Sequence, residues 1–113
     1  MLVQEYMSTD FEPHSCGEDA IIHDILSRMT EIGCVFVLND DKELVGIVTD
    51  GDLRRNMDAL MQRSAGQIAT KHPVTVTPDV LAARALAMMN ERKISVLLVV
   101  DDGGHPEGVL HIH

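Results

Sequence analysis

Residues 44–53 read LVGIVTDGDL: an aliphatic segment passes through Gly46 and ends in an acidic turn. Residues 107–113 read EGVLHIH and repeat the same beginning around Gly108, 62 positions later. A glycine at the same place in two aliphatic segments predicts two copies of one structural unit. Such a repeat has to be recognised before any other feature is interpreted, because it decides the fold.

The repeat extends over most of the chain. The offset of 62 also places residues 69–71 over residues 7–9, and an offset of 60 aligns residues 79–89 with residues 19–29. The offset changes where loops are expected, and loops tolerate changes of length. The repeat depends on pattern more than on identity, since few aligned positions carry the same residue.

Each copy is predicted to contain a strand, a helix, two strands and a second helix. Apolar residues at helical spacing indicate the helices, and continuous aliphatic runs indicate strands buried on both faces. The elements expected in the first copy are a helix from Asp19, strands at 34–38 and 44–49, and a helix opened by Asp52 as its N-cap. Those expected in the second copy are an extended segment at Val74 and Val76, a largely buried helix capped by Asp79, and strands at 94–100 and 108–112.

This order predicts an α/β fold made of two β-α-β-β-α repeats, residues 1–61 and residues 62–113. Each repeat is too small to bury its own sheet. The two are therefore expected to pack sheet to sheet with pseudo-two-fold symmetry. The second copy reaches His113 where its closing helix should begin, so we expect the chain to be a fragment of a longer polypeptide.

Composition excludes several classes of function. Of the 113 residues, 45% are hydrophobic and only 3% are aromatic, so the predicted core is aliphatic. The formal net charge of −9 argues against nucleic-acid or anionic-membrane binding, because both need clustered positive charge. No apolar run reaches the roughly 20 residues of a membrane span. Cys16 and Cys34 form no CxxC pattern, which favours a reducing, cytoplasmic location.

Several short motifs together resemble a tandem CBS-domain pair, or Bateman module, over essentially the whole chain. They are Val3–Met7, Leu44–Leu53, Ile68–Val76, Ala85–Met89 and Glu107–His113. Thr49–Arg55 and Gly108–His113 are similar to the C-terminal module of bacterial arabinose-5-phosphate isomerases, which carry a SIS catalytic domain in front. The resemblance implies a longer enzyme that interconverts ribulose 5-phosphate and arabinose 5-phosphate. It would serve synthesis of Kdo, a lipopolysaccharide sugar, with its active site outside this chain.

The resemblance also implies a nucleotide site, because CBS pairs commonly bind adenosyl nucleotides between their repeats. The family motif falls on Gly46, Thr49 and Asp52. A carboxylate can accept two hydrogen bonds from a ribose diol, and a hydroxyl with free N–H groups at a helix start can hold phosphate. Three neighbours complete this predicted half-site: Gly51, which lets the backbone come close, and Arg54 and Arg55, which would neutralise phosphate.

The remaining ligand-binding candidates follow from position in the family. Contacts to the base are expected from the opening segment of each copy, at Thr70, Lys71, His72 and Val74, and at Ser8 and Thr9. In the second copy His111 stands where Thr49 stands in the first, and the position matching Asp52 lies beyond residue 113. One complete half-site and one altered half-site are therefore expected.

Purely structural interpretations of the same residues stay open. Thr49 and Asp52 could serve only to cap a helix. Arg54 and Arg55 could belong to a solvated or dimer-contact face. His111 and His113 alternate on one strand face, but without a third ligand chance explains the spacing better than a metal, so no metal site is predicted.

No nucleophile, base and orienting group stand at a catalytic spacing, so no catalysis is assigned to this chain. The leading hypothesis is a regulatory module that needs no cofactor and binds an adenosyl or cytidyl nucleotide or a nucleotide-sugar. Its expected partners are an N-terminal SIS domain of the same polypeptide and a second copy in a homodimer. The alternative is a structural oligomerisation module with an apolar contact face formed by Leu53, Met57, Leu60 and Met61. An independent enzyme would need turnover by this chain alone.

Overall fold

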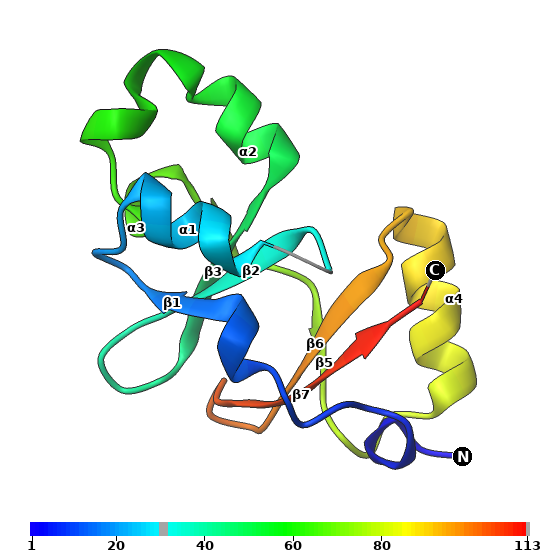
Figure 1. Cartoon of the computed structure of the whole chain (residues 1–113). Coiled ribbons are helices and arrows are strands. Elements are labelled where there is room, and N and C mark those ends of the chain that lie inside the picture. Colours follow the sequence, from blue (N-terminus) through cyan, green and yellow to red (C-terminus); the bar gives the residue numbers. More distant parts are fainter. Residues whose placement is uncertain (30–31, 113) are drawn as a thin grey trace. The chain divides into compact units, whose positions relative to one another are not determined.

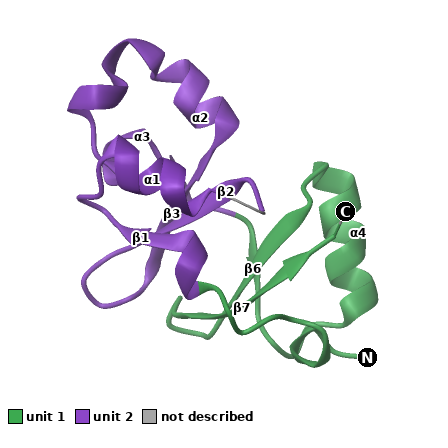
Figure 2. Cartoon of the chain, in the orientation of Figure 1, with its two compact units in different colours: residues 1–11, 74–113 green, residues 12–73 purple. Residues whose placement is uncertain are grey.

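The computed structural model describes residues 1–29 and 32–112 (Figure 1). The chain forms two compact units, one of residues 12–73 and one of residues 1–11 with 74–113 (Figure 2). The α/β class with two sheets is confirmed. The repeats at 1–61 and 62–113 are units of sequence and remain a prediction, whereas the compact units are units of packing.

The unit of residues 12–73 is built on a four-stranded sheet in the order β1-β2-β3-β4. β1 is parallel to β2, and the other neighbours are antiparallel. In chain order its elements are η2 (Glu12–His14), β1 (Ser15–Gly17), α1 (Ile22–Arg28), β2 (Cys34–Leu38), β3 (Leu44–Thr49), α2 (Asp50–Arg55), η3 (Met57–Gln62), α3 (Ala65–Ile68) and β4 (Thr70–Lys71).

The unit that contains both ends of the chain has a three-stranded sheet in the order β5-β6-β7. β5 is parallel to β6, and β6 is antiparallel to β7. Its elements are η1 (Val3–Glu5), β5 (Thr75–Val76), α4 (Ala82–Arg92), β6 (Val96–Val100) and β7 (Pro106–His111). Both units therefore share the order strand, helix, strand, strand.

The strand pairings of the two sheets are related by the same offset of 62 as the sequence. Val37 pairs with Gly46 in one sheet, and Val99 pairs with Gly108 in the other. Each sheet has an irregularity directly after the paired valine. At the next strand edge Ile47 pairs with Thr70, and the equivalent Val109 forms a bridge with Ser8. The opening segment of each sequence copy thus pairs with the glycine-containing strand of the other copy. This exchange explains why packing units and sequence repeats have different boundaries.

Both repeated glycines are required because a neighbouring segment passes too close to leave room for a side chain. A Cβ on Gly46 would lie 2.9 Å from Cβ of Ala69, and one on Gly108 would lie 2.6 Å from Sδ of Met7. Ala69 and Met7 are themselves related by the offset of 62. Any side chain at either glycine would push away the segment that crosses it.

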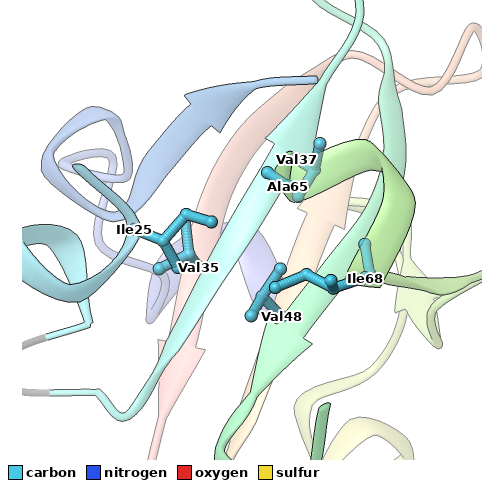
Figure 3. Packing of buried hydrophobic residues seen from close by; sticks show 7 residues of the cluster. Ile25, Val35, Val37, Val48, Ala65 and Ile68 are labelled. Carbon is cyan, nitrogen blue, oxygen red and sulfur yellow. The ribbon is translucent and has the colours of Figure 1, made fainter. Parts of the chain in front are cut away.

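Two aliphatic clusters form the cores. In the unit of residues 12–73, Ile25, Val35, Val37 and Val48 are fully buried against Ala65 and Ile68 (Figure 3). All five residues of β2 are buried, as the continuous apolar run predicts. The other unit has an equivalent cluster around Val3, Ala85, Met89, Leu97 and Val99.

The predicted helix starts are wrong. α4 begins at Ala82 after Leu81, and α1 begins at Ile22 after Ile21, and neither N-cap side chain makes a capping hydrogen bond. Asp79 instead accepts a 2.6 Å hydrogen bond from the Thr77 hydroxyl outside the helix. Tertiary pairing explains the delay. The N–H of Val3 donates a 2.8 Å hydrogen bond to the carbonyl oxygen of Val80. At the equivalent positions of the other unit, the N–H of Ala65 donates a 2.8 Å hydrogen bond to the carbonyl oxygen of Ala20.

The prediction that the second-copy helix is largely buried is also wrong. Only Ala85 and Met89 of α4 are buried. Leu86 is 53% exposed and its cap residue Leu81 is 56% exposed. Ala85 and Met89 form a narrow buried stripe, Met88 packs half-buried against the same cluster, and Leu86 faces outward.

Candidate ligand site

The predicted nucleotide motif forms a tight corner where β3 passes into α2. Thr49 is both the last residue of β3 and the N-cap of α2, so Asp52 is not the N-cap that the sequence predicts but the third residue of the helix. The Asp52 N–H donates to the Thr49 hydroxyl at 3.4 Å, and the Thr49 N–H donates to Asp52 Oδ2 at 2.9 Å. This reciprocal capping box satisfies two backbone donors at the helix start.

The carboxylate of Asp52 is buried and fully hydrogen-bonded. The residue is 2% exposed. Oδ2 also accepts from the Thr49 hydroxyl at 3.1 Å, while Oδ1 accepts from the Thr70 hydroxyl at 2.7 Å and from the guanidinium of Arg55. A buried carboxylate costs several kcal/mol unless such donors compensate it. Four donors to two oxygens use all its lone-pair directions.

The partners of Asp52 differ in how firmly they are held. The side chain of Arg55 is 65% exposed although it bonds an almost fully buried carboxylate. Thr70 is exposed as a residue and reaches Asp52 from β4, 18 positions along the chain. When an exposed arginine and an exposed hydroxyl leave, water replaces the hydrogen bonds that they lose, but the buried carboxylate then needs another donor in their place.

Thr49, Asp52, Arg55 and Thr70 are thus joined in one hydrogen-bonded group. Gly51 adjoins it, because a Cβ there would lie 3.1 Å from Nη1 of Arg55. Sequence reasoning named all five residues. It did not foresee that Arg55 and Thr70 bond Asp52 themselves, and no local pattern signals a contact across 18 residues.

The other predicted residues lie elsewhere. Gly46 lies under Ala69, where its role is packing. Arg54 is exposed on α2. Lys71 and His72 line a separate hollow of about 390 Å³ beside Leu44, at the opposite end of β3 from Thr49.

Four more of the named residues belong to the other unit. Val74 packs against its core cluster, and Ser8 forms a bridge with β7. Thr9 is exposed. His111 ends β7, as Thr49 ends β3. His113, the second histidine of the two-histidine pattern, lies outside the described residues.

Over residues 1–29 and 32–112, no three His, Cys, Asp or Glu side chains come together as a metal site would require. Burial raises the pKa of the Cys16 thiol to about 11 and that of Cys34 to about 12. Both thiols therefore stay protonated at neutral pH, as buried small hydrophobes do and reactive cysteines do not.

Sequence reasoning missed an apolar groove of about 760 Å³ in the unit that contains both chain ends. Its lining includes Tyr6, Leu86, Met89, Leu110 and Ile112. No motif groups these residues, because they come from the opening segment, from α4 and from the end of the chain. Among the described helices, none has the length and apolar character to cross a bilayer.

Comparison with known proteins supports the family. The model of the CBS domain matches residues 3–59 and 65–113. Among curated relatives, the arabinose 5-phosphate isomerase KdsD of Pseudomonas aeruginosa is 42% identical over 93 residues, which cover 78% of this chain and 28% of that enzyme. KdsD of Escherichia coli K12 is 35% identical over 116 residues, covering 98% of this chain and 35% of the enzyme. The chain thus spans about a third of the length of these relatives.

Solved structures share the fold. CBSX2 in complex with AMP matches with a TM-score of 0.82 and 24% identity, covering 97% of this chain and 89% of that one. The CBS domain pair of MJ0100, in complex with 5′-methylthioadenosine and S-adenosyl-L-methionine, matches with a TM-score of 0.81 and 22% identity, covering 98% and 89%. With the repeat, the strand register and the family match in agreement, this chain belongs to the CBS domain family.

Proposed function

We propose that this chain is the regulatory, ligand-binding module of a longer arabinose-5-phosphate isomerase, and that Asp52 binds the ribose of an adenosyl or cytidyl nucleotide. One observation carries the ligand proposal: the buried carboxylate of Asp52 already accepts an aliphatic hydroxyl, that of Thr70, at 2.7 Å. A ribose diol would present the same kind of donor to the same oxygens.

Thr70 and Arg55 both donate hydrogen bonds to the oxygen Oδ1. Ribose hydroxyls would take their place. The released guanidinium of Arg55 could then turn to a phosphate, which it binds in the same bidentate manner as a carboxylate. In this proposal the arginine supplies the charge for the phosphate, because the Asp52 N–H at the start of α2 is already bonded to Thr49.

Exchange at Asp52 would also transmit a signal. The bond from Thr70 to Asp52 ties β4 to α2. A ligand that replaces this bond frees β4, the strand that leads toward residue 74 and the other unit. Coupling between a ligand and a remote site is typically about 1–3 kcal/mol, which is close to the worth of one hydrogen bond to a charged group.

A screen of melting temperature tests the ligand class. We expect AMP, ATP or a CMP-linked sugar to raise the melting temperature of the chain, because a ligand that binds only the folded state stabilises it by mass action. The matched controls are the 2′,3′-dideoxy forms of the same nucleotides, which keep the base and phosphate. Equal shifts with and without the diol would show that Asp52 is only a helix-capping residue.

The curated relatives support the proposal that this chain is part of a longer enzyme. KdsD proteins are named as arabinose 5-phosphate isomerases, and this chain corresponds to about a third of their length. The proposed polypeptide adds an N-terminal SIS domain and works in the cytoplasm in Kdo and lipopolysaccharide synthesis. We expect no conversion of ribulose 5-phosphate by residues 1–113 alone, and turnover by this chain would contradict the assignment of catalysis to the SIS domain.

An oligomerisation module is the second candidate, favoured by two exposed methionines. Met57 is 61% exposed and Met61 is 79% exposed on η3. Leu53 and Leu60 pack inward against the core, so the predicted contact face of four residues is reduced to these two. Sizing by light scattering tests this role: Met57→Lys with Met61→Lys should abolish a homodimer, and dimers that persist would show that this face is not the contact.

A further inference from the structure

The guanidinium of Arg55 lies back over the first turn of α2. It donates to Oδ1 of Asp52, three residues earlier in the same helix. A Cβ on Gly51 would lie 3.1 Å from Nη1 of Arg55 and 3.6 Å from Oγ1 of Thr49. The side chain of Arg55 therefore lies across the corner that holds Asp52, and the glycine leaves room for it there.

The two ends of this ion pair lie in different surroundings. The side chain of Asp52 is 3% exposed, and that of Arg55 is 65% exposed. Water solvates a released guanidinium, but a buried carboxylate that loses a donor needs another donor in its place. Release of Arg55 therefore depends on what replaces it at Asp52 and on what the free guanidinium then binds.

A nucleoside and a nucleotide differ in how well they replace Arg55. The hydroxyls of either ligand supply hydrogen bonds to Asp52, but a nucleoside leaves both the carboxylate and the guanidinium without an opposite charge. A ligand that also carries a phosphate gives Arg55 a new anionic partner, which the planar guanidinium binds through two hydrogen bonds. The phosphate thus offsets the cost of breaking the ion pair.

We propose that Arg55 determines specificity at this site: its bond to Asp52 disfavours unphosphorylated nucleosides, and the phosphate of a nucleotide draws the guanidinium away from the carboxylate. This inference rests on the proposed binding of ribose by Asp52. Selection arises at the carboxylate because its lone-pair directions are filled while Arg55 and Thr70 stay bonded to it.

The nearby Arg63 is held in a different way. Its Nη1 donates to Oδ1 of Asn56 at 2.7 Å, and Nδ2 of Asn56 donates to the main-chain carbonyl oxygen of Asp52 at 2.7 Å. This chain of bonds ends on the backbone, so a ribose at the carboxylate leaves it in place. Arg55 shares an acceptor with the proposed ribose, and Arg63 does not.

Calorimetric titration of AMP and of adenosine tests this role. We expect the original chain to bind AMP at least about tenfold more tightly than adenosine. Arg55→Met keeps an unbranched stem but removes the guanidinium, which is both the competitor for Asp52 and the partner of the phosphate. It should bind adenosine about three- to tenfold more tightly than the original chain and should prefer AMP by less than about threefold. Arg63→Met, which removes an equal charge, should keep the affinities of the original chain.

The gain in adenosine affinity is the decisive result, because a residue that only contacts the phosphate would leave this affinity unchanged. An unchanged adenosine affinity in Arg55→Met, with AMP still bound by the original chain, would overturn the inference and leave the proposed function standing. If the original chain bound neither AMP nor adenosine, both the inference and the proposed function would be wrong.

A second measurement uses the original chain alone and covers the case in which Arg55→Met misfolds. Inorganic phosphate should bind the released guanidinium and raise the affinity for adenosine at least about threefold over sodium chloride at the same ionic strength, since coupling between two ligands is reciprocal. The same phosphate should weaken the binding of AMP, with which it competes. An adenosine affinity that phosphate lowers or leaves unchanged would contradict the proposal.

Discussion

The hydroxyl of Thr70 donates a 2.7 Å hydrogen bond to Oδ1 of Asp52, and this bond joins β4 to the first turn of α2. The same oxygen is bonded by the guanidinium of Arg55. In the proposed function, a ligand with similar donors replaces these two groups at the buried carboxylate. Variants of the corner separate such an exchange from a purely structural role.

Thr70→Val should tighten nucleotide binding. The valine keeps the shape of the threonine but removes the hydroxyl that competes for Asp52, so a ligand no longer has to displace it. We expect a several-fold lower Kd by calorimetry and a loss of about 1.5–3 kcal/mol in the free energy of unfolding by urea titration, the usual worth of a hydrogen bond to a charged group. Thr75→Val, on the other sheet, is the control. Weaker binding by Thr70→Val would mean that Thr70 contacts the ligand itself.

The two repeated glycines should be equally intolerant of substitution. Gly46→Ala and Gly108→Ala place a Cβ within 3.0 Å of the neighbouring segment, so each should lower the free energy of unfolding by about 1–3 kcal/mol. Gly17→Ala, which has nothing within 4 Å, should change it by less than about 0.5 kcal/mol. Urea unfolding measures all three. A neutral Gly108→Ala beside a damaging Gly46→Ala would contradict the equivalence of the two crossings.

The turn before β7 should weaken in acid. Hydrogen bonds from the backbone N–H of His105, and then from its side chain and the N–H of Gly103, hold the pKa of Asp101 below its ordinary value of 3.8. Because the folded-state pKa is depressed, the stabilisation is present above the unfolded pKa and is lost as pH falls through the folded one. Asp101→Asn should therefore flatten the pH dependence of unfolding below about pH 4. Urea midpoints between pH 2.5 and 7 measure this dependence, and a variant that unfolds with the same pH dependence as the original chain would contradict the prediction.

The repeat could be predicted from the sequence because it consists of local hydrophobic patterns. The buried run Cys34–Leu38 and the aliphatic run Leu44–Thr49 became β2 and β3 with the predicted bounds. Helix starts could not be predicted, because Val80 and Ala20 are held outside their helices by pairing with distant N–H groups of Val3 and Ala65. Local capping preference favours aspartate, but these tertiary bonds decide where each helix begins.

The candidate site could be predicted only in part, because only some of its contacts join residues that are close in sequence. Thr49, Gly51, Asp52 and Arg55 are neighbours in sequence, so the motif and the contacts coincide. Thr70 reaches Asp52 only because the strand pairing of Ile47 with Thr70 places β4 beside β3. Lys71 and His72, next along the chain, are carried away toward Leu44 by the same pairing. Neighbours in sequence therefore end in different places.

The most direct test of the account is calorimetric titration of AMP into the original chain, into Asp52→Ala and into Asp50→Ala. Asp50 is an exposed acid in the same helical turn. Asp50→Ala therefore removes one negative charge, as Asp52→Ala does, but leaves the hydrogen bonds of Asp52 in place. If Asp52 binds the ribose, Asp52→Ala should weaken binding by about 1.5–3 kcal/mol, roughly 10- to 150-fold in Kd, and Asp50→Ala should change it less than about threefold. Equal affinities for the original chain and Asp52→Ala would contradict it.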